Sequence, residues 1–210
     1  MAMHITEPRI KDYIMNLMPE RDDILKEMET YARENNFPII GPMCGIFLRQ
    51  LAMAIKAKSI FEMGSGYGYS AYWFAGGMPK DGKIICTEGS EDNKKRAMEY
   101  LRRGGFGSMV DFHVGYAQDV LKQYDGPFDI ILNDVDKEQY PEVFEMAIPK
   151  LRKGGIFITD NVLWSGRVLD DEPAESTRGI LEFNKMLFGS KDLLSMIIPI
   201  RDGLGMAIKL

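Results

Sequence analysis

Three polar residues in the middle of the chain, Asp134, Asp160 and Asn161, have the chemistry of metal ligands. Asp134 follows the apolar run 128–133, and Asp160 and Asn161 follow the apolar run 155–159. Carboxylate and amide oxygens select a hard cation such as Mg²⁺, Mn²⁺ or Ca²⁺, and two carboxylates in one cleft repel each other unless a cation separates them. If the two runs are neighbouring parallel strands, the three side chains meet at one edge of a sheet. The alternative is that each aspartate caps the turn or helix that follows its strand.

Lys137 stands three residues after Asp134 and therefore belongs to the same predicted edge. A lysine beside a bound cation can act as a general base, which makes Lys137 a candidate catalytic residue. The alternative is an ordinary surface lysine. No histidine or cysteine accompanies this group, which disfavours soft or borderline metal ions.

A glycine-rich segment, Gly-Ser-Gly-Tyr-Gly-Tyr-Ser at 64–70, follows the apolar run 59–63. Glycines let the backbone turn tightly and approach a ligand closely. The dinucleotide fingerprint needs a glycine where Tyr69 stands, and the segment lacks the lysine of a phosphate-binding loop, so a nucleoside-like ligand is favoured over a pyrophosphate. Glu88, after the run 83–87, can accept hydrogen bonds from ribose hydroxyls. The alternative interpretation of Glu88 is an ordinary surface glutamate in a turn.

Short apolar runs alternate with helical segments from residue 59 onward, which predicts βαβ units and a parallel sheet. We expect strands at 59–63, 83–87, 110–114, 128–133 and 155–159, and helices at 69–78, 91–104, 117–124 and 139–152. Ligands of such sheets bind beyond the carboxyl ends of the strands, which is where the candidate residues stand.

The two ends of the chain depart from this alternation. Apolar stripes predict helices over 9–36, interrupted at Pro19, and over 45–57. Near the other end, the strand-like runs 194–200 and 205–210 flank Asp202-Gly203, which is a hairpin signal. We therefore expect an antiparallel pair at one edge of the sheet.

The composition is that of one globular domain, 1–210, with 1–57 as its N-terminal helical part. The net charge of −5 argues against broad, phosphate-driven binding of nucleic acid. The two cysteines form no C-x-x-C pair, and neither a signal peptide nor a transmembrane run is visible. We expect a soluble, cytoplasmic protein without a membrane partner.

Taken together, the segments 61–70, 132–137 and 159–166 resemble the metal-dependent O-methyltransferases, a family that includes the catechol and caffeoyl-coenzyme A O-methyltransferases and bacterial relatives. The most specific of them is Asp-Asn-Val-Leu-Trp-Ser-Gly at 160–166, and the resemblance extends from about residue 10 to residue 210. It implies an α/β, Rossmann-like methyltransferase fold: a mostly parallel seven-stranded sheet with a C-terminal antiparallel hairpin and added N-terminal helices. It also implies a homodimer.

The resemblance further implies a role for individual residues. Contacts to S-adenosyl-L-methionine would come from Ile40, Gly64, Gly66, Tyr69, Ser70, Glu88, Ala117, Gln118 and Asp134. Within that set, Glu88 would bind the ribose, Ala117 and Gln118 would lie by the adenine, and Ile40 would border the reactive end. Asp134, Asp160 and Asn161 would bind Mg²⁺ or Mn²⁺, with Ca²⁺ as a further candidate, and Lys137 would be the base.

The substrate expected from these residues is a small hydroxylated molecule, such as a catechol or vicinal diol, because both of its oxygens can bind the cation. An alternative within the family is methylation of wobble 5-hydroxyuridine in tRNA. An NAD-dependent oxidoreductase is disfavoured by Tyr69, and a silent binding module by the intact acidic set with Lys137. The acceptor pocket is expected between the N-terminal helices and residues 164–176, where Trp164 either lines the pocket or packs.

Overall fold

Seven strands form one sheet in the order β3-β2-β1-β4-β5-β7-β6 in the computed structural model, which describes residues 5–210. The strands are β1 (Ser59–Met63), β2 (Lys83–Glu88), β3 (Val110–Val114), β4 (Phe128–Asn133), β5 (Leu151–Thr159), β6 (Leu193–Ile198) and β7 (Leu204–Lys209). Strands β1 to β5 pair in parallel, β7 pairs antiparallel with β5, and β6 pairs antiparallel with β7. The predicted Rossmann-like sheet with its C-terminal hairpin is confirmed.

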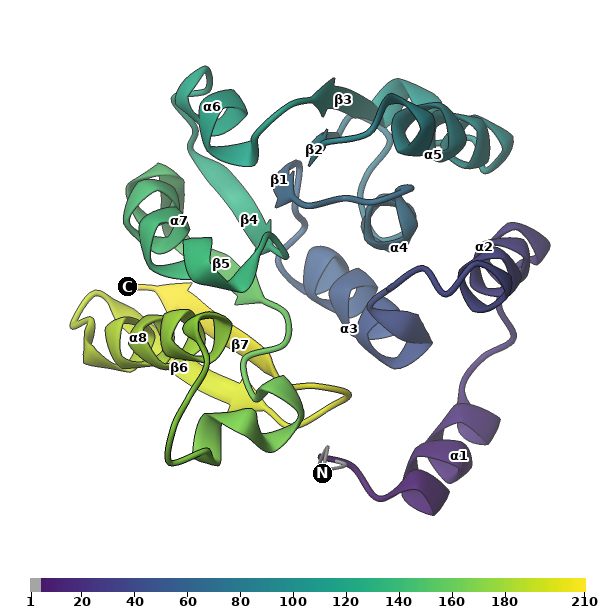
Figure 1. Cartoon of the computed structure of the whole chain (residues 1–210). Helices are drawn as coiled ribbons and strands as arrows, with labels where there is room; N and C mark the ends of the chain where they lie inside the picture. The colour runs from purple at the N-terminus through teal and green to yellow at the C-terminus, as the bar shows by residue number, and fades with distance from the viewer. Residues whose placement is uncertain (1–4) are drawn as a thin grey trace.

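Helices cover both faces of this sheet (Figure 1). They are α1 (Pro8–Leu17), α2 (Asp23–Glu34), α3 (Gly41–Ala54), α4 (Tyr69–Ala75), α5 (Glu91–Arg103), α6 (Ala117–Lys122), α7 (Tyr140–Ala147) and α8 (Glu175–Gly189). Helices α2 to α5 pack on one face, and α6, α7 and α8 pack on the other. The N-terminal helices therefore add to the first layer. None of the described helices is long and apolar enough to cross a membrane.

Alternation along the buried strands divides the core into two layers. In β4, Ile130 and Leu132 face the α2–α5 side, whereas Ile131 between them faces α6–α8. In β5, Ile158 and Phe157 divide in the same way. Successive strand residues point to opposite faces, so a strand that is apolar at every position must be covered on both sides. This is why the five apolar runs predict a parallel sheet.

Several sequence-based boundaries were wrong: β5 begins at Leu151 rather than at residue 155, and α3 and α4 end at Ala54 and Ala75 rather than at residues 57 and 78. The helix expected over 139–152 ends at Ala147, and Ile148–Lys150 forms a 3₁₀ turn that leads into β5. Pro149 cannot supply the N–H that an α-helix would need there, and Leu151 instead pairs with Phe128 of β4. Helix α3 begins at Gly41 rather than at residue 45, with proline in its first turn.

Helix α8 is absent from the sequence-based expectations, which place a pocket-shaping loop at 164–176 and no element between that loop and residue 194. The buried residues Thr177, Ile180, Phe183 and Leu187 of this helix recur at helical spacing. That stripe was present in the sequence. The polar segment before the helix obscured it, since no capping side chain marks its start.

Gly45 sets the distance between α3 and α4, the helices whose first turns carry Ile40 and Tyr69 to the site. A Cβ on Gly45 would lie 2.2 Å from the indole nitrogen of Trp73. We predict that Gly45→Ala lowers the free energy of unfolding by about 2 kcal/mol, because the added methyl overpacks a buried contact. Urea denaturation measures this. Gly189→Ala, where a Cβ meets nothing within 4 Å, is the control; equal stability of the two variants would contradict the prediction.

Candidate active site

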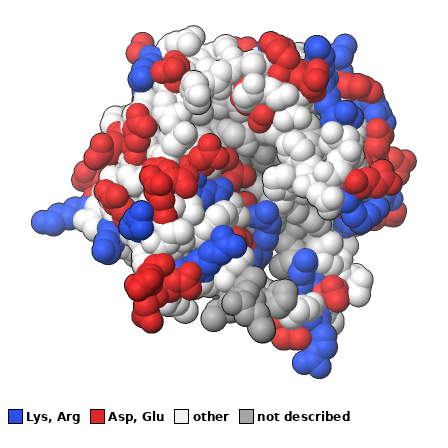
Figure 2. Space-filling model, in the orientation of Figure 1, with Lys and Arg blue, Asp and Glu red and all other residues white. Residues whose placement is uncertain are grey.

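A cavity of about 1040 Å³ opens beyond the carboxyl ends of the parallel strands. Figure 2 shows this face of the molecule hollowed, with charged side chains beside the hollow. Every residue singled out from the sequence lines it except one: Ile40, Gly64, Gly66, Tyr69, Ser70, Glu88, Ala117, Gln118, Asp134, Lys137 and Asn161. The exception is Asp160, whose residue is only 1% exposed. The topology thus gathers segments from across the chain at one place.

The glycine loop crosses the end of β1 in contact with its neighbours. The N–H of Ser65 donates to the carbonyl of Thr87 at 2.8 Å, which ties the loop to β2. Gly64 has φ +84°, and a Cβ there would lie 2.2 Å from the carbonyl oxygen of Asp134. Only glycine allows this approach, so the loop lies flat against the end of β4 and leaves the cavity open.

Glu88 is held by backbone and side-chain donors at the end of β2. One carboxylate oxygen accepts from the N–H of Gly66 at 3.0 Å, and the other accepts from Ser90 N–H at 3.2 Å and Asn93 Nδ2 at 3.0 Å. A carboxylate has about four lone-pair sites, so three internal donors leave capacity for one more. The carboxylate borders the cavity, where that site can meet a hydroxyl of a ligand.

Glu62 lies beneath the same loop and is a polar residue that sequence reasoning missed. Its side chain is fully buried and accepts hydrogen bonds from Ser70 Oγ and, at 3.4 Å, from Cys86 Sγ. Burial raises the pKa of the Glu62 carboxyl to about 7. Because it fixes the Ser70 hydroxyl at the start of α4, Glu62 supports the cavity wall from below. The sequence signal for a special role of Glu62 was its position as a charged residue inside the strand-like run 59–63.

Opposite ends of the cavity differ in character. At one end, Gln118 at the start of α6 donates to Gln139 at 3.0 Å, and Ala117 beside it is buried. At the other end, Ile40 precedes α3, and the Tyr69 hydroxyl donates to Glu29 of α2 at 2.9 Å. The first end offers amide groups beside apolar surface, and the second brings the N-terminal helices to the cavity.

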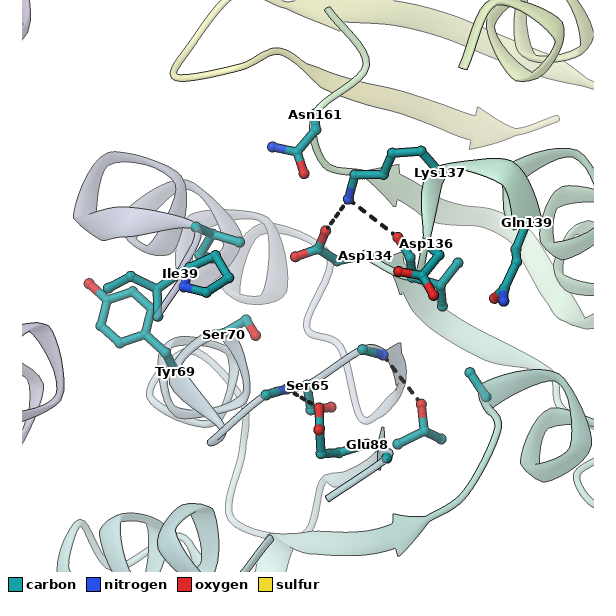
Figure 3. Close-up of a pocket in the computed structure, with 18 of the residues that line it drawn as sticks. Ile39, Ser65, Tyr69, Ser70, Glu88, Asp134, Asp136, Lys137, Gln139 and Asn161 are labelled. Carbon is teal, nitrogen blue, oxygen red and sulfur yellow. Dashed lines mark hydrogen bonds and ion pairs between the residues drawn. The ribbon is translucent and has the colours of Figure 1, made fainter. Parts of the chain in front are cut away.

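The acidic rim forms where β4 and β5 end together. Asn133 pairs with Thr159 in register, so Asp134 and Asp160 follow at the same level, as the sequence predicted for neighbouring strands. The Lys137 ammonium donates to Asp134 Oδ1 at 3.1 Å and to the Val135 carbonyl at 3.3 Å. Figure 3 shows the Asn161 side chain directed toward the same region. Only 13% of the Lys137 side chain is exposed, so its amine is confined to the rim.

Asp160 pairs with Arg201, which comes from the turn between β6 and β7. The guanidinium Nη1 lies 2.6 Å from Asp160 Oδ2, and Asn161 N–H donates to Oδ1 at 2.9 Å. Burial, followed by the charge of Asp134, raises the pKa of Asp160 to about 7, and Arg201 opposes that rise. Two carboxylates this close need positive charge between or beside them.

The same hairpin turn fastens the loop that carries Asn161. The Asp202 carboxylate accepts from Ser165 N–H and, at 3.2 Å, from Ser165 Oγ, while Asn161 Nδ2 lies 3.4 Å from its other oxygen. Asn161, Trp164 and Ser165 all have positive φ. Such a backbone persists only when its surroundings hold it, and here Asp202 does so.

The residues present fit a hard divalent cation in their chemistry. Asp134, Asp160 and Asn161 offer two carboxylates and an amide oxygen, all in one region of the rim. Across residues 5–210, no three His, Cys, Asp or Glu side chains gather in a way that could hold a metal, so the amide oxygen of Asn161 would have to be the third ligand. In the present structure Lys137 and Arg201 balance the two carboxylate charges.

The fold and the cavity together define a class: an α/β protein with a Rossmann-like sheet and a ligand-sized cavity over the glycine loop. A family model described as "O-methyltransferase" matches residues 16–210. The chain is 34% identical over 211 residues to a catechol O-methyltransferase of Niastella koreensis, covering 95% of this chain and 96% of that protein. It is 27% identical over 203 residues to a caffeoyl-CoA O-methyltransferase of Petroselinum crispum, covering 90% and 84%.

Solved structures agree. The O-methyltransferase TomG from Streptomyces achromogenes, in complex with SAM, superposes with a TM-score of 0.88 at 30% identity over 96% of both chains. An O-methyltransferase from Bacillus cereus in complex with SAH gives a TM-score of 0.88 at 28% identity over 96% of this chain and 97% of that one. The chain therefore belongs to this O-methyltransferase family and is an S-adenosylmethionine-dependent enzyme.

The buried carboxyl of Glu62 should make stability depend on pH. Between its ordinary pKa of 4.5 and about 7, only the folded state holds the proton, so this contribution is complete below pH 4.5 and is lost as pH rises to about 7. Glu62→Gln cannot ionise. We predict that its stability relative to wild type rises across this window, by on the order of 3 kcal/mol, and is constant above it.

Urea denaturation at a series of pH values, with EDTA present, measures this difference. Glu145→Gln, at an exposed position on α7, is the matched control and should follow wild type at every pH. A Glu62→Gln curve parallel to wild type would show that Glu62 ionises in the folded protein as it does in water.

Proposed function

We propose that this enzyme transfers a methyl group from S-adenosylmethionine to a hydroxyl of a small catechol-like or vicinal-diol substrate, with assistance from a divalent cation, Mg²⁺ or Mn²⁺. The observation that carries the proposal is the position of Lys137, Asp134 and Asn161 on the wall of the cavity that the glycine loop also lines. Methyl transfer needs the donor, the acceptor hydroxyl and a base within one small volume.

The cavity wall suggests how the donor would lie. Glu88 offers its remaining acceptor site to the ribose hydroxyls, and Ala117 and Gln118 border the space for the adenine. Gly64, Gly66, Tyr69 and Ser70 enclose the methionine part, and Ile40 borders its reactive end. Asp134 lies at the junction of donor and acceptor, since its carbonyl touches the glycine loop and its carboxylate faces Lys137.

The acceptor would lie against the rim. When bound, S-adenosylmethionine supplies a methyl group on a positively charged sulfur, and the cation held by Asp134, Asp160 and Asn161 lowers the pKa of the acceptor hydroxyl. Lys137 accepts the hydroxyl proton on Nζ, after the ammonium that pairs with Asp134 has given a proton to solvent. The oxygen forms its bond to the methyl carbon as the sulfur–carbon bond breaks, and the electron pair stays on sulfur. The Trp164 ring, which lies 5.6 Å from Lys137 Nζ, offers an apolar wall for an aromatic acceptor.

The catechol assignment is supported by the 34% identical catechol O-methyltransferase. The alternative acceptor, a wobble 5-hydroxyuridine of tRNA, would need positive charge around the cavity. The net charge of −5 and the acidic groups Asp136 and Glu138 on the cavity wall favour the small molecule.

Chelation tests the cation. We predict that methyl transfer from S-adenosylmethionine to catechol stops in EDTA and returns when excess Mg²⁺ or Mn²⁺ is added, because the acceptor hydroxyl then loses and regains its activating charge. Product formation is followed by mass spectrometry, with tRNA that carries unmethylated 5-hydroxyuridine as a parallel substrate. Undiminished transfer in EDTA would contradict cation assistance, and transfer to tRNA alone would replace the substrate class.

Lys137→Met tests the base. Loss of the proton acceptor should lower kcat by about 10²–10⁴-fold, the usual contribution of general-base catalysis. Calorimetry should show S-adenosylmethionine affinity close to that of wild type, because Lys137 would act on the acceptor. Lys122→Met, an exposed lysine on α6, is the control for removal of a charge. A kcat within twofold of wild type would exclude Lys137 as the base.

We also propose a homodimer that uses the apolar stripe of α1. Ile10, Tyr13 and Leu17 are 53%, 62% and 67% exposed, and no residue of α1 is buried. A helix with one uncovered apolar face gains by covering it against a second copy. Light scattering should give twice 23.8 kDa for the wild type and a shift toward 23.8 kDa for Tyr13→Glu. A monomeric wild type at micromolar concentration would contradict the proposal.

A further inference from the structure

Arg201 neutralises the charge of a proposed metal ligand and donates a hydrogen bond to one of its oxygens. Its guanidinium lies 2.6 Å from Oδ2 of Asp160, which is almost fully buried, and Oδ1 already accepts the N–H of Asn161. Both carboxylate oxygens are thus engaged by groups of this chain. A divalent cation that uses Asp160 has to share an oxygen with these donors or displace the guanidinium.

The backbone at Arg201 shows how firmly the fold places this side chain. Residues 200–203 form the tight turn between β6 and β7, closed by a hydrogen bond of 2.9 Å from Gly203 N–H to the Ile200 carbonyl. Arg201 is the first central residue of this turn and has φ +50°. Positive φ at that position favours glycine, and a long side chain adopts it only under constraint. The turn hydrogen bond and the pairing of β6 with β7 on either side of it supply such a constraint.

Open space also borders the side chain of Arg201. Its side chain is 33% exposed and lines two cavities, the main one and a second of about 790 Å³ formed with α1, α2 and the start of α3. A flexible guanidinium at the junction can leave Asp160 by rotating into the second cavity while the turn keeps its shape.

We infer that Arg201 is a built-in competitor of the divalent cation: its guanidinium neutralises Asp160 in the metal-free enzyme and releases Oδ2 when a cation binds. The inference rests on the proposed function, because it takes Asp134, Asp160 and Asn161 as the cation's ligands. Lys137 already pairs with Asp134, so the rim is electrically balanced without a metal. A divalent cation that enters the rim therefore has to replace the positive charge of Arg201 at Asp160, because the rim is not a purely negative site. Arg201 thereby lowers the affinity of the enzyme for its metal.

Metal affinity is the direct test. Mn²⁺ binding to the whole protein, measured by calorimetry and by the electron paramagnetic resonance signal of free Mn²⁺, should tighten by about tenfold or more in Arg201→Met, since a tenfold change needs only ~1.4 kcal/mol of competing ion-pair energy. Arg201→Gly should tighten it similarly, and because glycine adopts the positive φ of this turn without strain, it is the second variant to measure if the methionine variant does not fold. Arg152→Met is the control: it removes a comparable ion pair, with Asp129, at the opposite ends of β4 and β5.

Thermal stability provides a second readout. In EDTA, Arg201→Met should melt below wild type, because the buried Asp160 has lost its counter-charge. Saturating Mn²⁺ should then raise the Tm of both Arg201 variants more than that of wild type, since a ligand stabilises in proportion to how tightly it binds the folded state. For Arg152→Met the Mn²⁺-induced rise should equal that of wild type.

Two other results would each overturn the inference. Equal or weaker Mn²⁺ binding in both Arg201 variants would overturn the competition and leave the metal-assisted reaction standing. Absence of Mn²⁺ binding in wild type and variants alike, with methyl transfer that resists EDTA, would overturn both the competition and the proposed cation assistance.

Discussion

The site depends on hydrogen bonds that continue the parallel ladder one residue beyond the strands. Asp134 N–H donates to the Met63 carbonyl at 2.9 Å, and Asp160 N–H donates to the Asn133 carbonyl at 3.1 Å. These bonds align the first residues after β1, β4 and β5 in a single row. The glycine loop can touch Asp134 only because Gly64 lacks a Cβ. The glycine loop and the acidic rim are therefore adjacent for a reason that lies in the backbone.

That alignment has an electrostatic consequence. Placing two carboxylates in one row, with Asp160 out of solvent, disfavours their ionisation. Two cationic side chains from different elements compensate for this by pairing with the carboxylates. Lys137 comes from the segment directly after Asp134, whereas Arg201 comes from the far hairpin. Lys137 neutralises the carboxylate that lines the cavity, and Arg201 neutralises the buried one. The rim thus has a balanced charge.

Much of this could be predicted from the sequence because it is local. Three of the five apolar runs are followed by a carboxylate, and parallel strands end at one edge, so the residue order alone places Glu88, Asp134 and Asp160 together. The features that could not be predicted depend on packing between distant segments. The sequence around Arg201 predicts a turn but does not predict its ion pair with Asp160. The sequence around Glu62 predicts a strand but does not predict its hydrogen bond with Ser70. Helix α8 was missed because its apolar stripe comes after a polar segment without a capping side chain.

The clamp between Asp202 and the Asn161–Ser165 loop also sets an order of assembly. Its partners are separated by 41 residues or fewer along the chain, but the hairpin that carries Asp202 is the final part of the sheet to be synthesised. Segments that emerge early can organise first, whereas a contact to the last hairpin must wait for it. The glycine loop and β1–β4 precede that hairpin in the chain. Docking of β7 against β5 brings Asp202 to the loop that carries Asn161 and brings Arg201 to Asp160, so the acidic rim is complete only once this hairpin is in place.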